Sequence, residues 1–125
     1  MPILEHTVYP ERLIEHFSNP RNVGELAPPA VTVEASNPAC GDVLRLCARF
    51  EAGVAAEVRY SVRGCTASIA AGSALTEWMR GKTVAQIAAF EPSIVDRAVG
   101  GLPPASKHAA ALCADAVKLL VARAH

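Results

Sequence analysis

The hydrophobic pattern of this chain changes period once, at Gly64, and this change limits the folds that the chain can adopt. Over residues 31–62, apolar and polar side chains alternate, which is typical of strands with one buried face. From residue 65 onward, apolar residues recur at helical spacing. Strands followed by helices indicate an α+β fold, with one sheet and helices packed on one of its faces.

Three segments carry the alternating pattern. The strands that it predicts are residues 31–36, 43–50 and 54–62. A turn at Ala52-Gly53 joins the last two strands as a hairpin, so we expect a three-stranded antiparallel sheet. In the third strand, the alternation places Ala56 and Val58 on the apolar face.

Capping residues and helical spacing predict five helices. They are residues 9–17, 65–80, 84–89, 92–99 and 106–123. Gly81 ends the second helix, and Thr83 and Pro92 mark the starts of the next two. The expected apolar stripe of the last helix consists of Leu112, Ala116, Leu119 and Leu120.

Length and composition exclude several classes of protein. With 125 residues, we expect one domain over residues 1–125. Twelve basic and twelve acidic residues leave no net charge to attract nucleic acid or an anionic membrane. The N-terminal segment lacks the apolar run of a signal peptide or membrane span, so we expect a cytoplasmic protein with reduced thiols. Four cysteines are too few for a disulfide scaffold, so each is a core residue, a ligand or a nucleophile.

Cys40 and Asp42 lie in the segment NPACGDV, where the chain enters the second predicted strand. In an extended backbone, side chains two residues apart point to the same side, about 6 to 7 Å apart. These two residues could therefore bind one metal ion. The segment is equally consistent with a structural turn that holds a small buried cysteine and a capping aspartate.

Cys65 follows Gly64 where the third strand meets the long helix. The unpaired N–H groups and the dipole of a helix N-terminus stabilise a thiolate, and Arg63 acts in the same direction. Such a thiol could bind a metal or act as a nucleophile. The structural alternative is a small residue that lets the strand and the helix pack closely.

His108 lies in the first turn of the last predicted helix, where the dipole favours the neutral, metal-binding imidazole. A surface histidine is the alternative at such a position. Cys113 lies about 140° around the helix from His108 and cannot share a small site with it without distortion. We interpret Cys113 as a core residue and Cys47 as a structural or surface cysteine.

The segments HFSNPRNVGEL, NPACGDV, RGCTASIAAGSAL with GKT, and LPPASKHAAAL with DAVKLL occur in this order over nearly the whole chain. In sequence and spacing, they resemble the IscU/NifU-type iron–sulfur cluster assembly scaffolds, whose domain is the NifU-like N-terminal domain. The resemblance implies a SufE/NifU-like α+β fold with a three-stranded sheet. It also implies a cluster built from iron and from sulfur that a cysteine desulfurase delivers, with later transfer to apo iron–sulfur proteins.

Two of the family's cysteines and its aspartate have counterparts in this chain, but its third cysteine does not. That cysteine follows a histidine, here His108, and Ala109 occupies its position. LPP upstream and DAVKLL downstream align without a gap, so Cys113 lies a full helical turn beyond the position of the third cysteine and does not replace it. The ligands that the resemblance implies are Cys40, Asp42, Cys65 and His108.

These four ligands could hold Zn²⁺ tetrahedrally or a labile [2Fe–2S] cluster. Replacing a thiolate by harder nitrogen or oxygen ligands should make a cluster easier to release. We therefore expect a scaffold or carrier that binds iron and iron–sulfur clusters and is not an enzyme. Either sulfur arrives on Cys40 or Cys65, or the protein does not build clusters and only binds and carries them. The alternative is a zinc-binding or regulatory relative that engages the desulfurase without building clusters.

Two further interpretations concern catalysis and a chaperone. Cys65, His108 and Asp42 could be a nucleophile, a base and an orienting group, but the sequence shows no oxyanion arrangement or substrate pocket. We therefore predict no catalytic residue. The segment LPPASK departs from the LPPVK that a dedicated Hsp70-type chaperone recognises in some family members, which leaves that partner open.

Overall fold

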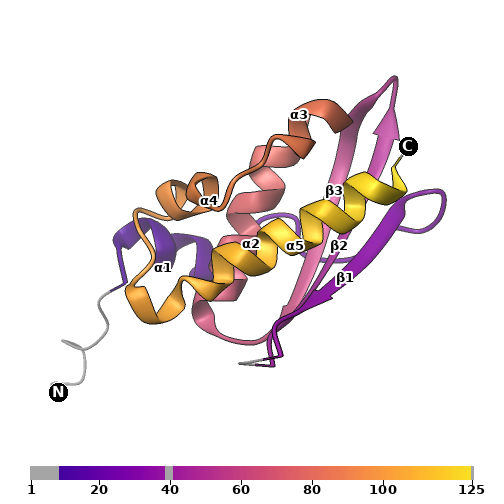
Figure 1. Cartoon of the computed structure of the whole chain (residues 1–125). Helices are drawn as coiled ribbons and strands as arrows, with labels where there is room; N and C mark the ends of the chain where they lie inside the picture. The colour runs from indigo at the N-terminus through magenta and orange to yellow at the C-terminus, as the bar shows by residue number, and fades with distance from the viewer. Residues whose placement is uncertain (1–8, 39–40, 125) are drawn as a thin grey trace, which may run out of the picture.

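One antiparallel sheet and the helices beside it make up the described part of the chain, residues 9–38 and 41–124 of a computed structural model (Figure 1). The strands are β1 (Val31–Ser36), β2 (Val43–Glu51) and β3 (Val54–Arg63), in the order β1-β2-β3. The helices are α1 (Glu11–Ser18), α2 (Thr66–Met79), α3 (Val84–Ala88), α4 (Pro92–Ala98) and α5 (His108–Arg123), with a 3₁₀ turn at Pro104–Ser106. The predicted α+β fold with a three-stranded antiparallel sheet is confirmed.

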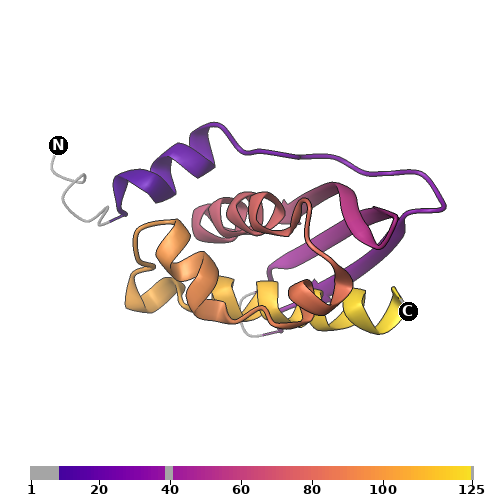
Figure 2. The same ribbon diagram turned by 90° about the horizontal axis from the view of Figure 1, so that it is seen from above.

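The helices form a second layer on one face of the sheet (Figures 1 and 2). Helix α5 packs on β1 and β2, and α2 packs on β3, while α1 packs against α2 and both α3 and α4 pack against α5. The segment between α1 and β1 runs along the molecule and pairs with the outer edge of β3 through Asn22, Val23 and Gly24. Among the helices that the structure describes, none has the length and hydropathy needed to cross a bilayer.

Small residues bring α2 close to the sheet. Ala67, Ala70 and Ala71 are fully buried, and Gly72 faces the ring of Tyr60. A Cβ atom at Gly72 would lie 2.5 Å from two ring carbons of Tyr60, so only glycine fits there. The Tyr60 hydroxyl donates a hydrogen bond of 2.7 Å to the carbonyl of Ile69. The first turns of α2 are therefore held at a fixed position on β3.

Two details of the predicted core are wrong. A register shift between Arg49 and Phe50 pairs Phe50 with Ala55, so Ala55 is fully buried and Ala56 is only half-buried. Strict alternation cannot anticipate such a β-bulge, because the extra residue reverses the facing of its neighbours. In α5, Leu119 is 43% exposed, whereas Val117 is buried, because the buried stripe lies further around the helix.

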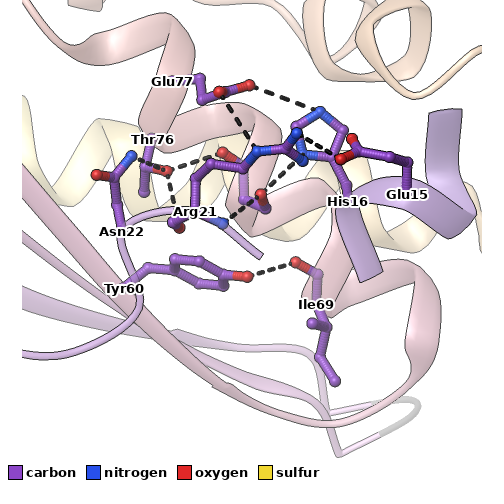
Figure 3. Close-up of polar contacts among 9 residues, drawn as sticks. Glu15, His16, Arg21, Asn22, Tyr60, Ile69, Thr76 and Glu77 are labelled. Carbon is purple, nitrogen blue, oxygen red and sulfur yellow. Dashed lines mark hydrogen bonds and ion pairs between the residues drawn. The ribbon is translucent and has the colours of Figure 1, made fainter. Parts of the chain in front are cut away.

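A buried histidine joins α1 to α2 (Figure 3). Nδ1 of His16 lies 2.7 Å from Oγ of Ser73, which accepts a hydrogen bond of 2.9 Å from the Arg21 N–H. The hydroxyl proton of Ser73 is thus available to His16, and the Arg21 guanidinium lies 3.2 Å from the same nitrogen. We assign Nδ1 as an acceptor in a neutral imidazole. Burial, and next the charge of Arg21, lower the pKa of His16, although Glu77 and Glu15 act in the opposite direction.

The lowered pKa of His16 predicts a loss of stability in acid. The unfolded chain binds a proton at His16 near about pH 6.5, before the folded protein does. The free energy of unfolding should therefore fall as the pH drops from about 6.5 through the lower folded pKa. In urea titrations at several pH values, His16→Gln should show a weaker pH dependence than the wild type. Equal slopes for the two proteins would contradict the prediction.

Gly72→Ala should destabilise the protein. Alanine in place of glycine favours a helix by about 1 kcal/mol, but overpacking a core costs about 1–3 kcal/mol. The Cβ atom meets a ring rather than a flexible chain end, so we expect a net loss. Urea unfolding followed by the fluorescence of Trp78, the single tryptophan, measures it. In a Tyr60→Leu background the loss should shrink, and an undiminished loss would exclude contact with the Tyr60 ring as its cause.

Candidate metal centre

Three residues with metal-binding side chains meet at one end of the sheet. Asp42 precedes β2, Cys65 is the N-cap of α2, and His108 is the first residue of α5. One ligand atom from each lies within 4.8 Å of the other two. Oδ2 of Asp42 is 3.2 Å from Sγ of Cys65 and 3.4 Å from Nε2 of His108, and Sγ is 3.6 Å from Nε2. The remaining predicted ligand, Cys40, lies outside the described residues.

The register of the sheet explains why Asp42 and Cys65 meet. Val43 of β2 pairs with Arg63 of β3, so the residues just beyond this pair lie next to each other. Gly64 then allows the approach, because a Cβ atom there would lie 2.5 Å from Cγ of Asp42. The two side chains are thus brought together by strand pairing and by the absence of a side chain at Gly64.

The loop between α4 and α5 positions His108, which directly follows it. Asp96 of α4 accepts a hydrogen bond of 2.6 Å from the Leu102 N–H and lies 3.3 Å from Nζ of Lys107. The bond from Leu102 and, to a smaller extent, Lys107 keep the pKa of Asp96 below its usual value. One carboxylate therefore holds this loop at Leu102 and at its last residue, Lys107, immediately before His108.

The site combines a buried acid with two more accessible groups. Asp42 is buried, whereas Cys65 and His108 are half-buried. Cys65 makes no side-chain cap on α2, and the first turn of this helix holds no acidic residue. The Asp42 carboxylate lies 3.5 Å from the Cys65 backbone nitrogen, where a negative charge is favoured by the helix dipole. A thiol, an imidazole and a carboxylate at these distances are a donor set suited to Zn²⁺ or iron.

The other described cysteines lie away from this group. Cys113 is 1% exposed within the hydrophobic core, and burial raises the pKa of its thiol to about 12. Cys47 is also buried, and its sulfur accepts a hydrogen bond of 3.3 Å from the Thr32 hydroxyl. Both are structural residues, as expected. Ala109, next to His108, is buried and offers no ligand atom.

Sequence reasoning missed Ser68. Its hydroxyl donates a hydrogen bond of 2.6 Å to Oδ2 of Asp42 and lies 3.4 Å from Sγ of Cys65. A possible signal was its spacing, since Ser68 follows Cys65 by three residues and so lies one helical turn further along the same face.

Several known proteins are similar in sequence to this chain. IscU of Azotobacter vinelandii, an iron–sulfur cluster assembly scaffold protein, is 36% identical over 90% of this chain and 91% of its own length. The scaffold protein IscU of Haemophilus influenzae is 35% identical over 91% of this chain and 93% of its own. The bifunctional protein NifU/MnmA of Rubrobacter xylanophilus is 44% identical over 87% of this chain, which spans only 23% of that protein.

Solved structures share the fold. A SUF-system scaffold candidate from Fervidobacterium islandicum superposes with a TM-score of 0.73, covering 93% of this chain and 98% of its own, at 18% identity. A NifU-like N-terminal domain from Brucella abortus gives 0.66, covering 90% and 94%, also at 18% identity. The family model for the NifU-like N-terminal domain matches residues 8–123. With a match of this extent and IscU relatives aligned over most of its length, the chain belongs to the NifU-like N-terminal domain family.

Proposed function

We propose that this protein is a scaffold on which iron–sulfur clusters are assembled and from which they are transferred. The observation that carries the proposal is the meeting of Asp42, Cys65 and His108 within 4.8 Å, in a chain of the NifU-like family. The cluster is cargo that is built and passed on, so the protein itself is not an enzyme. We also propose that residues 1–125 form one domain of this kind.

The proposed ligands are Cys40, Asp42, Cys65 and His108. Two thiolates provide the soft donors that bind iron–sulfur clusters, while imidazole and carboxylate are harder donors. Fewer thiolates should hold a [2Fe–2S] cluster less firmly, which suits a protein that must release it. The same four groups could hold one Zn²⁺ ion, and a zinc-binding or regulatory protein is the alternative function.

The proposed partners follow from the chemistry of assembly. A cysteine desulfurase supplies the sulfur, received on Cys40 or Cys65, and apo iron–sulfur proteins receive the cluster. We place these reactions in the cytoplasm, where thiols stay reduced. The segment LPPASK leaves recognition by an Hsp70-type chaperone open.

Anaerobic incubation with iron, cysteine and a cysteine desulfurase tests the function. We expect brown protein with near-stoichiometric iron and acid-labile sulfide per chain, together with visible cluster absorption. A Cys65→Ser variant is the negative control, because oxygen is a poorer donor than thiolate for a cluster.

Colourless protein that still binds zinc stoichiometrically would contradict the scaffold function and favour the regulatory one. In that case the Ala109→Cys variant tests why no cluster assembles. If this added thiol restores the brown cluster, the absence of a cysteine beside His108 is what prevents assembly.

Substitutions at His108 and Cys113 should show which of the two residues is a metal ligand and which is a core residue. His108→Ala removes a proposed ligand and should weaken zinc and iron binding about tenfold or more. Cys113→Ala should leave metal binding nearly unchanged and lower stability by about 1 kcal/mol, because it opens a small space in the core. Competition with a chromophoric chelator measures affinity, and urea unfolding measures stability. The reverse ranking of affinities would show that Cys113 is a ligand.

A further inference from the structure

Ser68 contacts two residues of the candidate metal centre, Asp42 and Cys65. It was not predicted from the sequence as a site residue, and it is not one of the proposed ligands. It lies one turn after Cys65 on α2 and is 2% exposed. Its hydroxyl donates a short hydrogen bond of 2.6 Å to Oδ2 of Asp42. The proton of Ser68 is thus directed at the carboxylate, while its oxygen lies 3.4 Å from Sγ of Cys65.

The orientation of the Asp42 carboxylate matters because several groups surround the same oxygen. Oδ2 faces the Ser68 hydroxyl, the thiol and backbone nitrogen of Cys65, and Nε2 of His108. The backbone of Gly64 closes another side, where a Cβ atom would lie within 2.5–2.9 Å of the carboxyl group. Ser68 is fixed by its helix and by burial, so it can restrict the rotation of the carboxylate.

We propose that Ser68 is a positioning residue of the metal centre, which acts by holding the Asp42 carboxylate in the orientation that a metal needs. This inference rests on the proposed function, because it takes Asp42 as a ligand. Groups that hydrogen-bond to a metal ligand commonly raise metal affinity by roughly 10–100-fold. Ser68 can supply this contribution without contacting the metal.

A purely structural role for Ser68 is the competing explanation, and α2 contains a matched control. Ser73 lies on the same helix, is fully buried, and has hydrogen bonds to His16 and Arg21. Ser73→Ala therefore removes a buried hydroxyl of the same kind without touching Asp42 or Cys65. An effect of Ser68→Ala that Ser73→Ala lacks is specific to the metal centre.

The experiment measures Zn²⁺ affinity by chelator competition and the visible spectrum of the Co²⁺-loaded full chain. Ser68→Ala should weaken Zn²⁺ binding about tenfold or more and shift the ligand-field bands of Co²⁺. Ser73→Ala should lower stability and leave both readouts within about twofold of the wild type. Ser68→Thr, which keeps the hydroxyl, should recover most of the affinity.

A double-mutant cycle with Asp42→Ala tests whether Ser68 acts through Asp42. Once the carboxylate is absent, adding Ser68→Ala should cause no further loss of affinity. This comparison also serves if Ser68→Ala alone fails to fold, because the double variant no longer buries a carboxylate that has lost its hydrogen bond from serine. A further loss in the double variant, unchanged affinity in Ser68→Ala, or an equal loss in Ser73→Ala would overturn the proposal. Wild-type protein that binds neither Zn²⁺ nor Co²⁺ would instead contradict the metal centre on which the proposed function rests, whatever the behaviour of the Ser68 variants.

Discussion

The close packing of α2 on β3 is the constraint on which the candidate site depends. Gly72 lets the helix lie against the Tyr60 ring, and the hydroxyl of Tyr60 binds the carbonyl of Ile69 in the first turns. These contacts fix the start of α2, and therefore Cys65, relative to β3. The pairing of β3 with β2 fixes Asp42 in turn. A thiol and a carboxylate are thus placed by packing and backbone hydrogen bonds, which hold side chains more firmly than a free loop would.

The third group, His108, depends on a separate set of contacts. The Asp96 carboxylate helps to set its position, because it binds Leu102 and Lys107 in the loop before α5. The three side chains therefore come from segments that only the complete tertiary structure brings together. Metal binding to such a site should stabilise the folded chain, since the unfolded chain offers no preformed ligand set.

The sequence was most informative where one physical rule dominates. Alternation of apolar and polar residues predicted the three strands. The bulge that buries Ala55 depends on how β2 pairs with β3, and the sequence of one strand alone does not contain this information. Proximity of Asp42 and Cys65 links residues 23 positions apart, so the family resemblance, rather than spacing, led to it. In the sequence, nothing distinguishes His16 from other polar residues of an amphipathic helix. Its burial is explained by the hydrogen-bond partners that the fold brings to it, Ser73 and Arg21.

The structure also explains why the missing third cysteine has no substitute nearby. Cys113 lies in the hydrophobic core with a pKa raised to about 12, and bringing its thiol to the site would require distorting α5. The proposed centre therefore has at most two thiolates, Cys40 and Cys65, beside an imidazole and a carboxylate. Such a mixed set suits both zinc and iron, so the ligands alone select weakly between them. We therefore expect the cargo of the proposed centre to depend mainly on which of iron, sulfide and zinc reaches it, so that delivery by a sulfur donor would commit the protein to cluster assembly.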